Sequence, residues 1–210
     1  MNPDIAPGKS FPDYVLPDHT RIPRRLSALQ GKDDPMLLVL IRGFFCPKDR
    51  EQLKELNRFY PQLVVGSCRL VVITTDDWHT TNNLRQQLDA HYPFLYDEKR
   101  QVRDELDIPE YTDTQHDPMV PHTFLLGPGL KIHRVWNGYY YWGRPSTAEL
   151  HAELRELTRG IRGDWDLSDP ELKRQWDAGV KTNFYPYGVK SMEQTLKEMA
   201  GAVDQYAGSA

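Results

Sequence analysis

Five consecutive apolar residues at positions 37–41 precede a glycine, a cysteine and a proline, and this stretch constrains the fold more than any other. An apolar run without alternation is typical of a strand that is covered on both faces of its sheet. The polar segment after Pro47 carries leucines and aromatic residues at helical spacing, and proline is favoured at the first helical position. The sequence therefore predicts a buried strand, a turn through Gly43 and a helix that begins at Pro47.

Cys46 falls at or beside the N-cap of the predicted helix, where free N–H groups and the positive end of the helix dipole favour a thiolate. Arg42, Lys48 and Arg50 lie close to it in the sequence. Asp49 acts in the opposite direction, because a nearby carboxylate disfavours ionisation of a thiol. A lone cysteine is commonly a small buried hydrophobic residue, but this placement favours a reactive thiol. We therefore take Cys46 as the candidate nucleophile.

The segment at 42–53 reads RGFFCPKDREQL. It resembles the Arg-Gly-x-Trp-Cys-Pro-x-Cys-Arg-x-Gln-Leu segment of thioredoxin-fold redoxins, in the peroxiredoxin-like branch of the alkyl hydroperoxide reductase and thiol-specific antioxidant group. Asp49 stands where a dithiol redoxin has its second cysteine, which excludes disulfide exchange within a Cys-x-x-Cys motif. Gly43 stands where typical peroxiredoxins have the threonine of a Thr-x-x-Cys motif, and Val39 replaces their upstream proline.

The resemblance covers residues 8 to 160 and implies an α/β thioredoxin-like fold, with a mixed central sheet flanked by helices and a helical or irregular C-terminal extension. We expect residues 1–160 to form the redoxin domain. A capping box at 168–171 and an apolar stripe between Met192 and Tyr206 indicate helices in the extension at 161–210. This extension would bury its aromatic residues on the core or on a second subunit, and the second arrangement would make a homodimer.

Local patterns place further elements around the central strand. They predict an extended lead-in or edge strand at 8–19, a strand at 70–74, a surface helix at 80–91, a short strand at 93–97, a short helix near 102–108, an antiparallel hairpin at 119–136 and an amphipathic helix after a capping box at 146–149. The helix after Cys46 carries an apolar stripe from Leu53 to Leu63, although Pro61 would kink it or end it early.

The strand, helix, strand order after position 37 predicts a parallel crossover. Ligands in open α/β sheets bind beyond the carboxyl ends of the strands, so Trp78 should lie on the same rim as Cys46, with Phe45 and Pro47 beside it. Cys68 precedes its strand and should lie at the opposite rim, about 15–20 Å away at ~3.3 Å per residue. A disulfide between the two cysteines is therefore excluded.

The segment at 120–124 resembles the Val-Pro-x-Thr-Phe segment of thioredoxin-fold proteins, whose proline is cis and faces the active cysteine. This resemblance implies that Pro121 faces Cys46 and that His122 or Thr123 lies within reach of it. Peroxiredoxins carry their activating arginine near the position of Pro121, so an activating cation must come from elsewhere in this chain.

Arg42 and Arg144 are the candidates for that cation, because an arginine can stabilise both a thiolate and a peroxide oxygen through charge-assisted hydrogen bonds. Each could equally be a solvated surface charge. The aromatic segment at 137–145 either forms an apolar wall around the thiol or is a surface that the C-terminal extension covers.

Composition and motifs exclude several classes of function. The net charge of -4 and the pI of 6.0 give no basic footprint for nucleic acid or an anionic membrane. Neither a membrane-spanning run nor a signal peptide is present, so we expect a cytoplasmic protein. His116 and His122 do not form a metal motif, and we found neither a phosphate loop nor a dinucleotide fingerprint. We therefore expect no metal and no cofactor.

The sequence and the resemblance together predict a thiol-dependent oxidoreductase of the one-cysteine peroxidase type. Cys46 would attack a hydroperoxide or another small oxidant, and an external thiol would reduce the resulting sulfenic acid. Two alternatives stay open. The protein could be a redoxin-fold binding or redox-sensing protein without turnover, or a redoxin recruited to a specialised biosynthetic reaction.

Overall fold

The computed structural model describes residues 1–31, 34–139, 142–161 and 168–181. The chain divides into two compact units, Met1–Leu157 and Thr158–Ala210. The described part of the second unit contains α6 (Pro170–Asp177), which is capped by Asp169, whose side chain accepts a hydrogen bond from the backbone N–H of Glu171 at 2.8 Å. The helix predicted between Met192 and Tyr206 lies outside the described residues.

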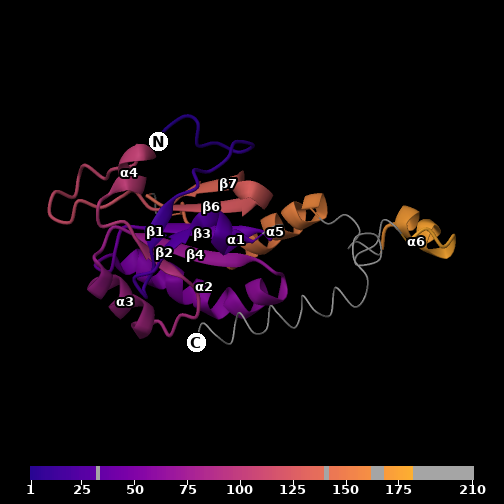
Figure 1. The fold of residues 1–210 in the computed structure, drawn as a ribbon, viewed down its shortest axis with the longest axis horizontal. Coiled ribbons are helices and arrows are strands. Elements are labelled where there is room, and N and C mark those ends of the chain that lie inside the picture. Colours follow the sequence, from indigo (N-terminus) through magenta and orange to yellow (C-terminus); the bar gives the residue numbers. More distant parts are fainter. Residues whose placement is uncertain (32–33, 140–141, 162–167, 182–210) are drawn as a thin grey trace. The chain divides into compact units, whose positions relative to one another are not determined.

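The first unit is built on a mixed sheet of five strands (Figure 1). The strands are β3 (Met36–Ile41), β4 (Arg69–Thr74), β5 (Phe94–Tyr96), β6 (His122–Gly127) and β7 (Lys131–Asn137), in the order β5-β4-β3-β6-β7. β3, β4 and β5 are parallel to one another, whereas β6 is antiparallel to both β3 and β7. The mixed sheet and the antiparallel hairpin are as predicted, with a short 3-10 turn, Pro128–Leu130, between β6 and β7.

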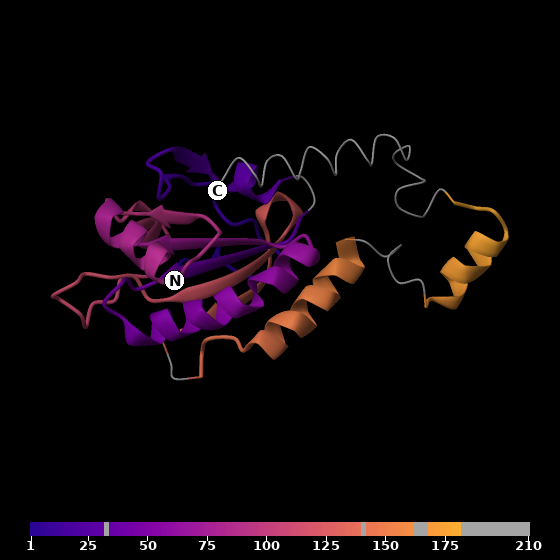
Figure 2. The same ribbon diagram turned by 90° about the horizontal axis from the view of Figure 1, so that it is seen from below.

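Helices cover both faces of this sheet. They are α1 (Leu26–Gln30), α2 (Pro47–Val65), α3 (Trp78–Gln87), α4 (Gln101–Glu105) and α5 (Thr147–Ile161). Apolar residues of α2, α3 and α5 share one core cluster with the sheet, and those of α1, α4 and the N-terminal segment share the other. Figure 2 shows α2 running along one face of the sheet. Every residue of β3 is buried, which confirms the prediction of a strand covered on both faces.

Two local predictions are met only in part. Pro61 does not end α2, which continues to Val65, so the helix tolerates the loss of one internal hydrogen bond at an exposed position. The extended segment predicted at 8–19 contacts both edges of the main sheet through isolated bridges, from Ser10 to Lys131 of β7 and from Asp18 to Leu95 of β5. Between these bridges, β1 (Val15–Pro17) pairs with β2 (Pro23–Arg25) in a separate two-stranded hairpin that the sequence did not predict.

Within the described residues, no helix is long and apolar enough to cross a membrane.

Asp18 holds the β1–β2 hairpin together. Its carboxylate is 2% exposed and accepts hydrogen bonds from the backbone N–H of Thr20 at 2.8 Å, the backbone N–H of Ile22 at 3.1 Å and Nε of Arg24 at 2.9 Å. Burial alone would raise the pKa of Asp18, but the hydrogen bonds from Thr20 and Arg24 outweigh it, so the pKa lies below its ordinary value.

We predict that Asp18→Asn lowers the free energy of unfolding at neutral pH by about 1–3 kcal/mol, because a charged acceptor is lost from a buried network. A lowered folded-state pKa stabilises the protein above the unfolded-state pKa of about 4, and this contribution is lost as the pH falls through the folded-state value. Urea unfolding at neutral and acid pH should therefore show a difference between variant and wild type that shrinks in acid. A difference that stays constant with pH would contradict this role.

Candidate active site

Cys46 is the N-cap residue of α2 and follows directly on the turn from β3. Its backbone N–H donates to the carbonyl of Gly43 at 3.1 Å, and its carbonyl accepts from the N–H of Arg50 at 3.2 Å. The helix begins at Pro47, as the sequence predicted. The sulfur therefore lies at the end of the helix where unpaired N–H groups favour negative charge.

The turn before Cys46 requires glycine. Gly43 has φ of +139°, and a Cβ atom at this position would come within 2.7 Å of a carboxylate oxygen of Asp76. That carboxylate, at the end of β4, accepts hydrogen bonds from the N–H of Phe44 and the hydroxyl of Thr74, each at 2.8 Å. Burial raises the pKa of Asp76, although these two hydrogen bonds oppose the shift. Gly43 thus lets the end of β4 fix the loop that carries the cysteine.

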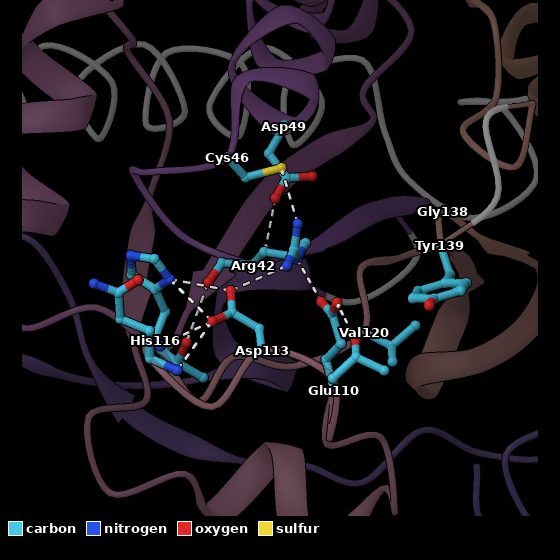
Figure 3. Close-up of polar contacts among 12 residues, drawn as sticks. Arg42, Cys46, Asp49, Glu110, Asp113, His116, Val120, Gly138 and Tyr139 are labelled. Carbon is cyan, nitrogen blue, oxygen red and sulfur yellow. Dashed lines mark hydrogen bonds and ion pairs between the residues drawn. The ribbon is translucent and has the colours of Figure 1, made fainter.

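Arg42 comes from the end of β3 and lies beside the sulfur (Figure 3). Its Nη1 is 4.0 Å from Sγ of Cys46, its Nε is 2.5 Å from a carboxylate oxygen of Glu110, and its Nη2 is 3.2 Å from Asp113. The approach to Glu110 is an ion pair rather than a well-angled hydrogen bond. Burial opposes the charge of Arg42, but Glu110 and the Cys46 sulfur outweigh it and raise the pKa of the guanidinium.

Asp49 is completely buried in the first turn of α2. One carboxylate oxygen accepts the backbone N–H of Arg42 at 2.7 Å, and the other forms a close ion pair with Nη2 of Arg144. Arg144 also donates to the carbonyl of Gly138 at 2.7 Å. From the sequence, the carboxylate of Asp49 was expected to disfavour ionisation of Cys46. In the structure this carboxylate is paired with an arginine, and it joins β3, α2 and the segment between β7 and α5.

A cavity of about 430 Å³ opens beside Cys46. Its lining residues are Arg42, Cys46, Pro47, Lys48, Glu110, Pro121, Gly138, Tyr139 and Arg144. Cys46 itself is only 1% exposed, and it forms part of the wall of this cavity. The wall combines two prolines and an aromatic ring with arginine groups, an arrangement that can hold an uncharged organic group next to a polar reacting atom.

The remaining sequence-predicted site residues fall into two groups. Pro47 and Pro121 line the cavity with Cys46. Phe45 directly precedes Cys46 in the chain, and its ring stacks on the ring of His116 with the centroids 3.7 Å apart.

Three predicted residues face elsewhere. Thr123 is buried and accepts a hydrogen bond from Gln52 of α2 at 3.0 Å. His122 is 2% exposed, its Nδ1 lies 2.8 Å from the carbonyl of Val120, and burial lowers its pKa. Trp78 follows β4, but its indole N–H donates to the carbonyl of His19 at 2.8 Å, and none of the three lines the cavity.

Comparison with protein families decides the relationship that the motif suggested. The model of the AhpC/TSA family matches residues 7–135, more than half of the 210 residues. The chain belongs to the AhpC/TSA family. A search of curated protein sequences found no match.

Solved structures of AhpC/TSA-type proteins share the fold. Peroxidoxin BcpB from Mycobacterium tuberculosis is 23% identical, with a TM-score of 0.62 over 74% of this chain and 97% of that chain. AhpC from Enterococcus faecalis is 13% identical, with a TM-score of 0.62 over 74% and 95%. A cysteine-to-serine mutant of peroxiredoxin 6 of Arenicola marina is 15% identical, with a TM-score of 0.62 over 77% and 76%. These likenesses confirm the predicted α/β thioredoxin-like fold.

The second cysteine of this AhpC/TSA chain lies far from the first. Cys68 directly precedes β4, whereas Cys46 follows β3, and the two strands are parallel and in register from Met36 with Arg69 to Ile41 with Thr74. The cysteines therefore lie at opposite ends of the sheet, and both are free thiols. Burial raises the pKa of Cys68 to about 12, so this thiol stays protonated at neutral pH.

Sequence reasoning missed the carboxylates that contact Arg42. Glu110 and Asp113 lie in the polar segment after α4, where no periodicity indicates which side chains face the sheet. The available signal was their position, because this segment leads into β6 beside Pro121 and carries several acidic residues. Tyr139 was not singled out from the sequence. It belongs to the aromatic segment at 137–145, for which an apolar wall around the thiol was one of two expectations.

Outside the cavity, ligand atoms of His133, Glu153 and Glu156 lie within 4.8 Å of one another. Glu153 already contacts Nε2 of His133 at 3.1 Å and Nε of Arg134 at 3.6 Å. Protein groups therefore already balance the charge of this carboxylate.

The Asp49–Arg144 pair should contribute strongly to stability because its carboxylate is fully buried. We predict that Asp49→Asn lowers the free energy of unfolding by about 3–5 kcal/mol, since it leaves the largely buried guanidinium of Arg144 without its carboxylate partner. Arg144→Met should cost a similar amount, and the double variant should lose clearly less than the sum of the two.

Urea unfolding of the four proteins measures this coupling. The exposed pair of Glu55 and Arg58 on α2 is a matched control, for which the same cycle should give less than about 1 kcal/mol. Additive losses at Asp49 and Arg144 would show that the pair does not join the elements of the site.

Proposed function

We propose that this protein is a one-cysteine peroxidase, in which Cys46 reduces a hydroperoxide and an external thiol restores it. The observation that carries the proposal is the position of the Cys46 sulfur, at the N-terminus of α2, on the wall of a cavity and 4.0 Å from Nη1 of Arg42. Membership of the AhpC/TSA family supports the same chemistry.

In the first step, the Cys46 thiolate attacks the distal oxygen of the hydroperoxide. The S–O bond forms as the O–O bond breaks, and the proximal oxygen leaves with the electron pair and takes up a proton to become an alcohol. The sulfur is thereby oxidised to a sulfenic acid and the peroxide is reduced. Arg42 stabilises the thiolate and the developing charge on the departing oxygen through its Nη1 group.

In the second step, an external thiol attacks the sulfenic acid, forms a mixed disulfide and releases water. A second thiol then displaces Cys46 and completes a disulfide of the reductant. Two features support an external reductant over an internal one. Asp49 occupies the position of a second active-site cysteine, and Cys68 is buried at the opposite end of the sheet with a raised pKa.

The size and the lining of the cavity favour organic hydroperoxides over hydrogen peroxide as substrates. Pro47, Pro121 and Tyr139 offer apolar contacts around the sulfur, and a volume of about 430 Å³ accommodates an organic group. The guanidinium of Arg144 lines the same cavity, but it is engaged with Asp49 and with the carbonyl of Gly138. We therefore assign Arg144 to holding the cavity wall in place and Arg42 to the reacting oxygen.

Stopped-flow measurement of hydroperoxide consumption tests the proposal. Wild-type protein should consume one equivalent rapidly in the absence of thiol and turn over when a dithiol is added, because the sulfenic acid needs an outside reductant. Cys46→Ser should lose this reaction, whereas Cys68→Ser should retain it. Equal slow consumption by wild type and Cys46→Ser would end the peroxidase proposal and favour a binding or sensing role.

A further inference from the structure

We propose that Glu110 and Asp113 are positioning residues that aim Arg42 at the sulfur of Cys46. This inference deepens the proposed function and rests on it, because it concerns the arginine that would stabilise the thiolate and the departing oxygen. Neither carboxylate belongs to the cysteine motif at 42–53. Both come from the segment between α4 and β6, and Asp113 is 71 residues distant from Arg42 in the sequence.

The three nitrogen groups of Arg42 each have a different partner. Nε lies 2.5 Å from Glu110 and Nη2 lies 3.2 Å from Asp113, which leaves Nη1 directed at Sγ of Cys46 at 4.0 Å (Figure 3). A guanidinium is planar, so fixing two of its nitrogens fixes the direction of the third. The contact with sulfur is the longest of the three, and the two carboxylates therefore determine where the guanidinium lies.

The carboxylates are themselves held in place. The Glu110 side chain is 8% exposed, its backbone N–H donates to the carbonyl of Pro118 at 2.9 Å, and the hydroxyl of Thr112 donates to its carboxylate at 3.1 Å. Asp113 accepts the backbone N–H of His116 at 3.1 Å and contacts its ring Nδ1 at 3.1 Å. That ring stacks on Phe45, the neighbour of Cys46.

The base of the segment is also fixed. A bridge between Pro109 and Met119 closes it, and the carboxylate of Asp117 pairs with Nε of Arg100 at 2.9 Å and Nη1 of Arg103 at 2.5 Å. Glu110 and Asp113 therefore present a preformed pair of acceptors to Arg42. A long arginine side chain loses considerable rotamer freedom when it is fixed, and this pair of anchors offsets that loss.

The two carboxylates have two opposite effects on the ionisation of Cys46, one through their negative charge and one through the position that they give to Arg42. Two negative charges near the sulfur disfavour its thiolate if only their field matters, whereas they favour the thiolate if they hold Arg42 against it. Neutralising both groups therefore separates the two explanations by the sign of the effect. A simple field effect increases the reactivity of Cys46, and the loss of a positioning effect decreases it.

The experiment compares full-length wild type with Glu110→Gln/Asp113→Asn, which keeps the side-chain shapes. We expect the rate of alkylation of Cys46 by the uncharged reagent iodoacetamide at neutral pH to fall by about threefold to tenfold, the loss that follows from an opposite charge moving away from a thiolate. The ultraviolet absorbance of the thiolate, taken as the difference from the matching Cys46→Ser proteins, should fall in parallel. This second measurement does not depend on access of the reagent to the cavity.

The same two substitutions are then made in an Arg42→Gln background. There they should no longer lower the alkylation rate or the absorbance, because no guanidinium remains to be aimed. Glu55→Gln, at an exposed pair on α2, is the control for a Glu→Gln change and should match wild type. If the double variant unfolds, the single variant Asp113→Asn replaces it, because this side chain is 17% exposed. The alkylation rate and the thiolate absorbance should then fall in the same direction but by less.

An unchanged or increased alkylation rate in Glu110→Gln/Asp113→Asn would overturn the inference. An equal fall in the Arg42→Gln background would also overturn it, because the carboxylates would then act without Arg42. Alkylation needs no peroxide, so this result is independent of turnover. A wild-type protein that consumes no hydroperoxide would refute the proposed function, whereas the alkylation series decides the role of Glu110 and Asp113.

Discussion

The buried carboxylate of Asp49 is the interaction on which the geometry of the site depends. It accepts the N–H group of Arg42 at the end of β3 and pairs with Arg144 from the segment between β7 and α5. Because an unpaired buried charge costs several kcal/mol, the carboxylate requires Arg144 to stay against the first turn of α2. One side chain thus fixes the backbone on one side of Cys46 and the cavity wall on the other.

The two cysteines of this chain lie in different surroundings. Cys46 caps a helix, lines a cavity and lies beside a guanidinium. Cys68 is buried before β4, and the cost of placing a charge in apolar surroundings raises its pKa to about 12. The same residue type therefore packs in the core at one end of the sheet and lines a cavity beside an arginine at the other.

The central part of the fold could be predicted because its signals are local. The unbroken apolar run at 37–41, the proline at 47 and the hairpin around residue 128 each depend on neighbouring residues, and the structure has β3, α2 and the β6–β7 pair in those places. Two short motifs, at 42–53 and 120–124, suggested the AhpC/TSA relationship, which the family model over residues 7–135 shows. Local patterns of this kind survive in the folded protein because the core fixes them from both faces.

The site was less predictable because its contacts cross the chain. The segment around Glu110 and Asp113 has no hydrophobic periodicity, so only the folded structure shows that these two side chains contact Arg42. His122 and Thr123 illustrate a second limit. Successive strand residues point to opposite faces of the sheet. In the observed register His122 pairs with Leu40 and Thr123 with Val39, and neither His122 nor Thr123 lines the cavity.

Peptide mass mapping after one equivalent of an organic hydroperoxide, with dimedone present, tests most directly whether Cys46 reacts alone. The account predicts a dimedone adduct on the peptide that contains Cys46, no modification of the peptide that contains Cys68, and no disulfide between them. Failure of Cys46 to form the adduct, or a disulfide that joins the two cysteines, would contradict it.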